Sequence, residues 1–385
     1  MKIRILEEPR IICQNPASPH CYFGWPTVGR LPDGSLLTVA SGLRVAHVCP
    51  FGKVVGIRSR DEGRTWSNPE VLIDTPLDDR DAGLLPLANG RVILTSFTNT
   101  PDFQRGYADR TKLPYVNAYL DLVEAAGGWE QYHGATLAVS RDGGHHFSLP
   151  HVVPLSSPHG PCQLADGTVL YVGSVNSEAE AGRSCIECHT VDEEGRLTFR
   201  SRIENGDEEG LRYNEPHARA LRDGRILVHI RAENYRAGIF TLFESVSEDG
   251  GYTFTKPRRL LSDAGGAPAH ILELSDGTVL SVYGHRAAPY GIRAMVSRDG
   301  GRSYEIDLVL TDAEPSADLG YPSSVELADG AILTVYYAKL PTGNGSALKQ
   351  IVYRIEEEGA AGYLCKIAIY PTRYIAIAVK IKKMR

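Results

Sequence analysis

The stretch Leu221-Arg-Asp-Gly-Arg-Ile-Leu-Val228 is one of six near-copies of a phrase, Leu-x-Asp/Asn-Gly followed by a β-rich run. The copies are Leu31–Gly34, Leu87–Gly90, Leu164–Gly167, Leu221–Gly224, Leu274–Gly277 and Leu327–Gly330. Their glycines lie 56, 77, 57, 53 and 53 residues apart, and this period is typical of a four-stranded propeller blade. Each Asp-Gly or Asn-Gly is expected to form a tight hairpin turn between two apolar strands. The sequence therefore predicts an all-β fold, a six-bladed β-propeller.

A second repeated phrase, S-x-D-x-G-x-[TSH]-aromatic, supports the same count. Its copies are Ser59–Trp66, Ser140–Phe147, Ser247–Phe254 and Ser297–Tyr304, with a degenerate fifth at Asp192–Phe199. The Asp side chain can cap backbone N–H groups, the Gly permits a positive φ, and the aromatic ring can pack the turn onto the blade. This phrase is the Asp box, and we expect its aspartates to be structural.

Composition excludes several classes of protein. The chain has 385 residues, 42% of them hydrophobic and 23% charged, as in ordinary soluble proteins. A net charge of −6 argues against a nucleic-acid partner. The charged first residues resemble neither a signal peptide nor a membrane span. Seven cysteines without framework spacing indicate free thiols, so we expect a cytoplasmic protein.

Cys185-Ile-Glu-Cys188-His189 fits the haem-attachment pattern, but it lies in an alternating segment that leads into the degenerate Asp box. A zinc site would need a partner cluster, which the sequence does not offer. No cofactor and no metal site are therefore expected.

One propeller domain is predicted over residues 1–360. Residues 3–14 and 349–357 read as extra strands, and such folds usually let one terminus complete the last blade and remove open edges. An atypical β-rich and basic tail follows at 361–385, either an edge strand with a solvated end or a membrane-surface segment.

The long interval between blades two and three contains an insertion, residues 101–134. A helix is predicted at 115–126, closed by Gly127-Gly128. Such an insertion is more typical of a lid or an oligomer contact than of the core.

Hairpin symmetry predicts which side chains meet at the axis. Glu215 stands six residues before Leu221, and Arg231 lies as far after Asp223 as Glu215 lies before it. The two should therefore emerge together at one face of the disc. Applied to every blade, the position of Glu215 selects Trp25, Asp81, Pro158, Glu215, Pro268 and Tyr321. These six residues should form a ring at the mouth of the axis, the default binding site of a propeller.

With these features the chain resembles the sialidase superfamily over roughly residues 20–345. Asn214–Arg231 resembles the family segment that carries the catalytic glutamate and an arginine of the substrate-carboxylate clamp. Gly291-Ile-Arg293 resembles the segment of the clamp's last arginine, and Leu319-Gly-Tyr321-Pro resembles the segment of the nucleophilic tyrosine.

The resemblance implies a retaining glycosidase in which Glu215 takes the proton of Tyr321. Sialidases use a tyrosine because the anomeric carbon carries a carboxylate, which would repel an anionic nucleophile. A phenol is a weak nucleophile and needs an adjacent base. Arg231 and Arg293 would bind the sugar's anionic group through bidentate hydrogen bonds.

Two first-blade positions depart from the family pattern. Gly24 stands where a clamp arginine should be, and the family's acid would fall near His47, in a stretch without aspartate. Asp81 is the preferred replacement acid and His47 the alternative, with a reference pKa suited to the task. Arg80 could restore a cation. Asp81 could also simply cap a turn, and the Glu215–Arg231 pair could be structural.

Three further residues are candidate substrate contacts. Trp25 is either a core residue or a stacking platform for a sugar. Among the histidines near the site by strand position, His270 and His285 are the candidate contacts, whereas His217 and His229 are expected to be structural.

The predicted function is an exo-acting retaining glycoside hydrolase for sialic acid or a related ulosonic or uronic acid. Its partner would be a carbohydrate with an anionic group, and the 101–134 insertion could mediate an oligomer. The alternatives are a non-catalytic glycan- or protein-binding propeller and a polysaccharide lyase, in which a Tyr or His abstracts a proton next to a uronate carboxylate.

Overall fold

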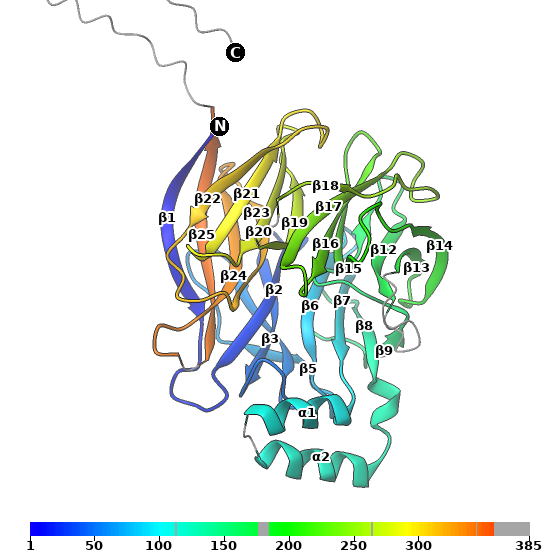
Figure 1. Cartoon of the computed structure of the whole chain (residues 1–385), viewed down its shortest axis with the longest axis vertical. Coiled ribbons are helices and arrows are strands. Elements are labelled where there is room, and N and C mark those ends of the chain that lie inside the picture. The colour runs from blue at the N-terminus through cyan, green and yellow to red at the C-terminus, as the bar shows by residue number, and fades with distance from the viewer. Residues whose placement is uncertain (112–113, 176–184, 263–264, 344, 358–385) are drawn as a thin grey trace, which may run out of the picture.

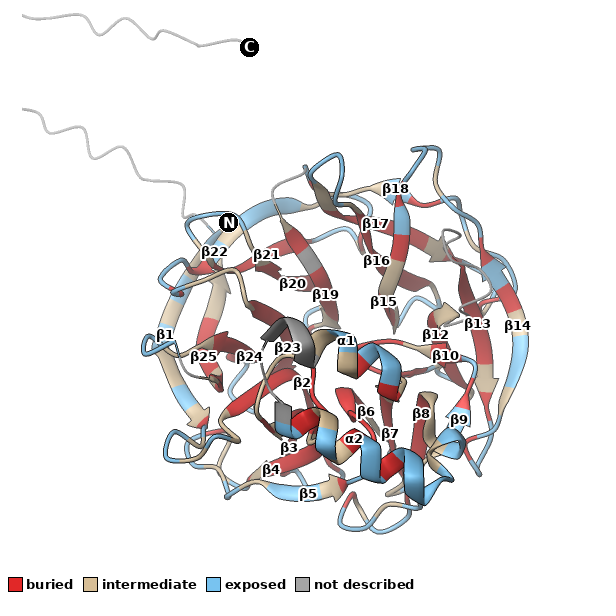
Figure 2. Ribbon diagram, turned by 60° about the horizontal axis from the view of Figure 1, so that its bottom comes forward, coloured by how far each residue is buried: buried red, intermediate tan, exposed pale blue. Residues whose placement is uncertain are grey.

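Six antiparallel sheets stand around one axis in the computed structural model, which describes residues 1–111, 114–175, 185–262, 265–343 and 345–357 (Figures 1 and 2). Blade one is β2 (Tyr22–Arg30), β3 (Leu36–Arg44), β4 (Lys53–Ser59) and β5 (Glu70–Ile73). Blade two is β6 (Arg80–Pro86), β7 (Val92–Thr98), β8 (Gly134–Ser140) and β9 (His151–Val153). Blade three is β10 (Leu155–Ser156), β11 (Cys162–Gln163), β12 (Val169–Val175), β13 (Ile186–Val191) and β14 (Leu197–Ile203).

The remaining blades follow the same order from the axis outward. Blade four is β15 (Arg212–Ala220), β16 (Ile226–Asn234), β17 (Ile239–Ser247) and β18 (Arg258–Arg259). Blade five is β19 (Gly266–Glu273), β20 (Val279–His285), β21 (Gly291–Ser297) and β22 (Glu305–Thr311). Blade six is β23 (Leu319–Glu326), β24 (Ile332–Lys339), β25 (Ser346–Glu356) and β1 (Lys2–Cys13). The prediction of a six-bladed propeller is confirmed.

Strand β1 closes the ring. It pairs antiparallel with β25, from Lys2 opposite Glu356 to Cys13 opposite Leu348. The expected strands at 3–14 and 349–357 are therefore the two outer strands of blade six. This pairing places the first residues of the chain in the last blade and covers an edge that would otherwise expose unpaired N–H and C=O groups. The tail predicted at 361–385 lies outside the described residues.

The six Asp-Gly or Asn-Gly turns adopt one conformation. In each, the N–H of the leucine donates to the carbonyl four residues later, at 2.7–2.8 Å, as from Leu221 to Arg225. The turn glycines have φ between 78° and 90°, a region that other residues enter at a steric cost. All six turns join a first to a second strand, so they share one face of the disc, called the hairpin face below. The inner strands begin at the opposite face, the mouth.

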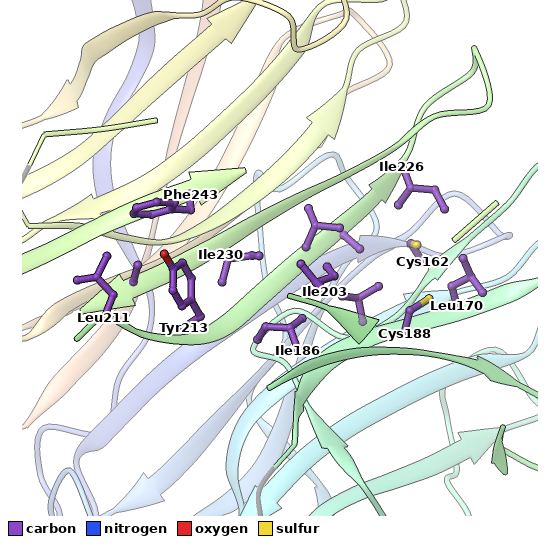
Figure 3. Packing of buried hydrophobic residues seen from close by; sticks show 14 residues of the cluster. Cys162, Leu170, Ile186, Cys188, Ile203, Leu211, Tyr213, Ile226, Ile230 and Phe243 are labelled. Carbon is purple, nitrogen blue, oxygen red and sulfur yellow. The ribbon is translucent and has the colours of Figure 1, made fainter. Parts of the chain in front are cut away.

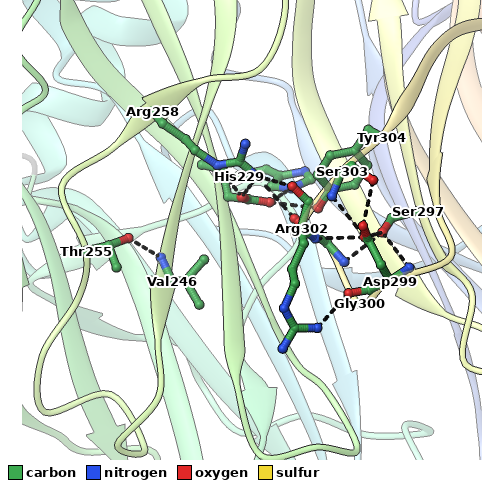
Figure 4. A network of polar contacts seen from close by, with 12 residues as sticks. His229, Val246, Thr255, Arg258, Ser297, Asp299, Gly300, Arg302, Ser303 and Tyr304 are labelled. Atoms are coloured by element: carbon green, nitrogen blue, oxygen red, sulfur yellow. Dashed lines mark hydrogen bonds and ion pairs between the residues drawn. The ribbon is translucent and has the colours of Figure 1, made fainter.

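The Asp boxes form as predicted. Asp61, Asp142, Asp249 and Asp299 each accept a 2.9 Å hydrogen bond from the backbone N–H four residues later. Figure 4 shows the box of Asp299, whose Tyr304 reaches from blade five to Glu244 of blade four at 2.7 Å. These aspartates therefore hold turns together and connect neighbouring blades.

The core is a series of apolar clusters between adjacent blades. Figure 3 shows the cluster between blades three and four, with Cys162, Cys188, Ile226 and Phe243 among its buried members. Burial of one such large apolar side chain contributes roughly 1.5–3 kcal/mol, so each blade depends on its neighbours for stability.

The insertion contains α1 (Pro101–Thr111), α2 (Pro114–Ala126) and a 3-10 turn at Trp129–Tyr132. Helix α2 matches the predicted helix, whereas α1 was not predicted, although Thr100 caps it by accepting the N–H of Phe103. Because the insertion follows β7, it lies at the mouth, where Figure 2 shows both helices over that face. Val116 and Leu120 of α2 pack against Phe51 of blade one.

The structure bears on the expectations about the Cys185–His189 motif, the cysteines and a membrane span. Cys188 is buried in the core, and His189 lies 2.8 Å from Glu187. Within the described ranges, none of the six cysteines forms a disulfide, and no group of three or more His, Cys, Asp and Glu is placed to hold a metal ion. No helix in that part of the chain is long and apolar enough to cross a membrane.

Candidate active site

The ring residues occupy β-bulges. Four of the six have a positive φ, namely Trp25 (56°), Asp81 (52°), Glu215 (46°) and Tyr321 (47°). In each case the pairing of the inner strand with the second strand shifts register across that position. A bulge redirects a side chain out of the sheet pattern. Such conformations cost about 1–3 kcal/mol each and cluster at functional sites, so their repetition marks the mouth as the candidate site.

Tyr321, Glu215 and Arg231 are in direct contact, as the hairpin symmetry predicted. The Tyr321 hydroxyl donates to Glu215 Oε1 at 2.8 Å, and Arg231 Nη1 donates to Glu215 Oε2 at 2.6 Å. Arg231 also donates through Nε to Glu233 Oε2 at 2.7 Å and through Nη2 to the Tyr235 hydroxyl at 2.7 Å. Both oxygens of Glu215 are thus occupied, one by the phenol and one by a cation.

The electrostatics favour a carboxylate next to a neutral phenol. Burial favours the protonated form of Glu215, but the charge and hydrogen bond of Arg231 outweigh it and hold its pKa below the ordinary value. Burial, followed by the negative charge of Glu215, raises the pKa of Tyr321 well above its usual range. At neutral pH Glu215 can therefore accept the proton of Tyr321, the arrangement that a tyrosine nucleophile requires.

Asp81 is the second acid of the ring and is 6% exposed. Burial and then the negative charge of Glu215 raise the pKa of Asp81 to about 7. Two carboxyl groups in one site are thus driven to different protonation states, a pattern typical of acid–base catalysis. Asp81 therefore retains a proton up to about pH 7, whereas Glu215 is already ionised there.

His47 lies at the rim of the site. Its Nδ1 is 2.8 Å from the Tyr22 hydroxyl and 3.5 Å from Asp318, and burial lowers its pKa. Asp318 also accepts from the Tyr22 and Tyr337 hydroxyls. The imidazole therefore belongs to a hydrogen-bonded group beside the Tyr321–Glu215 pair.

Trp25 and Arg80 form the blade-one side of the site. The Arg80 guanidinium stacks over the Trp25 ring, with Cζ 4.4 Å from its centroid, and Arg80 Nη1 donates to the His47 carbonyl at 2.9 Å. Trp25 is 1% exposed. Of its two predicted roles, the structure places Trp25 in the packing beneath the site and presents no open ring face to a sugar.

The arginine beside Tyr321 is Arg286 and not the expected Arg293. Arg293, on β21, donates to the carbonyl of Thr311 in the outer strand of its own blade at 2.9 Å. Arg286, which was not predicted, follows β20 at the mouth, and its Cζ lies 5.7 Å from the Tyr321 ring centroid. Arg286 donates through Nε and Nη2 to the Leu319 carbonyl.

The two candidate histidines, His285 and His270, lie at different depths in the propeller. His285 ends β20 at the mouth and lies 3.1 Å from the Pro289 carbonyl. His270 lies deeper on the axis, where its ring is nearly parallel to that of His217 and the two ring centroids are 4.5 Å apart.

Hairpin symmetry carries signals that could have found the missed residues. The counterpart of Tyr321 across its turn is Tyr337, the Asp318 partner described above. In blade five the corresponding position is Gly284, and Arg286 is the next residue on the same side of that strand. Asp318 follows β22 in a connecting segment and had no such signal.

A family model described as BNR repeat-like domain matches residues 116–334, more than half of the chain, so the protein belongs to this family. The resemblance to sialidase-like BNR-repeat propellers is thereby confirmed. A search of the curated proteins found no match.

Solved structures support the same fold. A protein of unknown function from Dyadobacter fermentans has a TM-score of 0.73 at 21% identity, over 92% of this chain and 99% of the other. The NanB sialidase of Streptococcus pneumoniae has a TM-score of 0.60 at 12% identity, over 91% and 71%. An α-L-arabinanase of Penicillium chrysogenum also has a TM-score of 0.60, at 14% identity, over 91% and 98%. Such low identities establish the propeller and leave activity to be argued from the site.

Proposed function

We propose that the protein is a retaining glycoside hydrolase that removes a terminal acidic sugar, with Tyr321 as nucleophile, Glu215 as its base and Asp81 as acid/base. The observation that carries the proposal is the 2.8 Å hydrogen bond from the Tyr321 hydroxyl to an ionised Glu215. Propellers of similar fold include sialidases and an α-L-arabinanase, which supports a glycosidase site in this mouth.

The reaction would proceed in two displacements. Tyr321 attacks the anomeric carbon as its proton passes to Glu215, and Asp81 protonates the departing glycosidic oxygen. In the second displacement water attacks the glycosyl–tyrosine bond, Asp81 accepts the water proton, and Glu215 returns its proton to Tyr321. Each group ends in its starting protonation state.

The acidic substrate class follows from the nucleophile and the cations. A neutral phenol is suited to an anomeric centre that bears a carboxylate, because a carboxylate nucleophile would be repelled. Arg286 uses Nε and Nη2 on Leu319, which leaves Nη1 for a substrate oxygen. Arg80 Nε is buried without a hydrogen-bond partner among the described residues. Arg231 is already committed to Glu215, Glu233 and Tyr235 and would mainly orient the base.

The test is hydrolysis of a panel of aryl glycosides of sialic acid, related ulosonic acids and uronic acids. Release of the aryl group should occur with at least one acidic sugar and fall by about 1000-fold or more in Tyr321→Phe and in Glu215→Gln. Tyr115→Phe, on the surface of the insertion, should retain full activity. Unimpaired hydrolysis by Tyr321→Phe would refute the mechanism. An unsaturated product would indicate a lyase, and tight glycan binding without turnover would indicate a non-catalytic propeller.

A further inference from the structure

A polar cavity lies on the axis, on the hairpin side of the ring. It has a volume of about 360 Å³ and is lined by residues of all six blades, from Thr27 in blade one to Val325 in blade six. This volume far exceeds the space that one water molecule requires. The cavity is separate from the Tyr321–Glu215 pair, and neither residue lines it.

The charge of the lining is entirely positive. None of the lining residues is Asp or Glu, whereas two are arginine and three are histidine. Arg30 is neutralised by a bidentate pair with Glu62 at 2.6 and 2.9 Å. Arg219 forms no direct ion pair in the described part of the chain, although the charge of Glu273 acts on it, and its Nε is buried there without a hydrogen-bond acceptor. A cationic group in this state is stabilised by a bound anion.

Two of the three histidines are fixed as hydrogen-bond donors by their backbone contacts. His217 Nδ1 accepts the N–H of Ile271 at 2.9 Å, and His270 Nδ1 accepts the N–H of Ser324 at 3.4 Å. Burial lowers the pKa of both rings well below the usual range, so each is neutral and carries its proton on Nε2. A protonated nitrogen cannot ligate a cation, and together with the lack of acids this disfavours a metal ion.

The third histidine, His159, offers a hydrogen-bond acceptor where the other two offer donors. Its Nδ1 lies 3.0 Å from the Thr27 hydroxyl, which can itself donate to the Pro158 carbonyl at 3.3 Å. That chain of bonds places the ring proton on Nδ1 and leaves Nε2 as an acceptor. His159 is 2% exposed, and its Nε2 has no hydrogen-bond partner among the described residues. The cavity thus combines three donor groups with one buried, unsatisfied acceptor.

We propose that this cavity is a binding site for a small oxyanion that carries a hydroxyl group, of which hydrogen phosphate is the simplest form. Arg219 and the Nε2–H groups of His217 and His270 donate to its oxygens, and His159 Nε2 accepts its hydroxyl proton. The site is independent of the proposed hydrolase reaction, because it uses none of the residues assigned to it.

Isothermal titration of the full chain with inorganic phosphate tests the proposal. Saturable binding is expected, at least tenfold weaker in Arg219→Met because a charge-assisted hydrogen bond is lost. Arg286→Met removes a cation from the mouth and serves as the matched control, with phosphate affinity expected within about twofold of wild type. Sulfate should bind about tenfold more weakly, because at neutral pH it has no hydroxyl for His159.

The outcomes separate the possibilities. Absence of binding at about 20 mM phosphate, or loss of binding in Arg286→Met with retention in Arg219→Met, would overturn the proposal. A hexose phosphate, which at neutral pH is mostly the dianion without a P–OH group, should bind more weakly than inorganic phosphate, and tighter binding would contradict the role of His159. If Arg219→Met does not fold, NMR of the histidine rings in the wild-type protein decides, since phosphate must shift the resonances of the three cavity histidines.

Discussion

Replacement of Asp81 by asparagine should make the protein more stable at neutral pH while removing a group that the mechanism needs. The carboxyl group is 6% exposed, and its burial together with the charge of Glu215 raises the pKa of Asp81 to about 7. In the unfolded chain the same carboxyl ionises freely in water. Ionisation of Asp81 therefore opposes folding, and an asparagine avoids that cost.

The size of the effect follows from the two pKa values. The pKa of Asp81 moves from 3.8 to about 7, and a tenfold change in acid strength corresponds to about 1.4 kcal/mol. Because the folded-state pKa is raised, the stability from the neutral form is fully present below about pH 4 and is lost as pH rises through about 7. The stability gain of Asp81→Asn should therefore be close to zero at pH 4 and reach about 4 kcal/mol above pH 7.

Urea unfolding of wild type and variant between pH 4 and pH 8 measures this difference. Asp79 also has a pKa raised to about 7 by burial, but it is present in both proteins and its contribution cancels. Asp312→Asn, at an exposed position, is the matched control and should show no such pH-dependent gain. A difference that stays flat across this pH range, or a variant less stable than wild type at pH 8, would refute the reasoning.

The same carboxyl should set the alkaline limb of the pH–rate profile. A general acid must be protonated, so kcat/KM on the best aryl glycoside should fall tenfold per pH unit above about 7. In Asp81→Asn the residual rate should lose this limb. If His47 were the acid, the limb would persist in Asp81→Asn and disappear in His47→Gln.

Three other predictions concern the nucleophile pair, the arginines and the closing strand. Tyr321→Phe and Glu215→Gln should each lower kcat by about 1000-fold or more without shifting the thermal unfolding profile by more than a few degrees. A raised KM with an unchanged kcat would instead argue that these residues only bind the substrate. Arg286→Met should lower kcat/KM by about 10- to 100-fold, whereas Arg293→Met should affect mainly stability. A larger loss of kcat/KM in Arg293→Met than in Arg286→Met would show that Arg293 belongs to the active site. Deletion of residues 1–13 should lower the unfolding temperature and promote aggregation in size-exclusion chromatography, because it exposes the edge of the last blade; an unchanged, monodisperse protein would show that this strand is dispensable.

The repeat predicted the architecture because a hairpin relates sequence position to height along the axis. Once Asp223 was taken as a turn, the face on which Glu215 and Arg231 emerge followed from counting. That is why the contact of Tyr321 with Glu215 could be anticipated from two segments 106 residues apart.

The features that could not be predicted from the sequence are the β-bulges, the residues at the ends of strands and the extent of burial. A β-bulge inserts a residue without a recognisable sequence signal. The positive φ of Asp81 could not be predicted, because the residue at that position is not glycine. Arg293 fitted the family spacing, yet its side chain bonds to the outer strand of its own blade, and Arg286 lies beside Tyr321. The raised pKa of Asp81 depends on how completely neighbouring blades cover it, which only packing determines.

The most direct test of the central claim is to look for the glycosyl–tyrosine bond. The protein would be incubated with a fluorinated glycosyl fluoride of the best acidic sugar, which slows the second displacement, then quenched, digested and examined by mass spectrometry. The account predicts that the peptide containing Tyr321 gains the mass of one glycosyl residue and that fragmentation places it on the phenol oxygen. A turned-over substrate that leaves this tyrosine unmodified, or labels another residue, would contradict it.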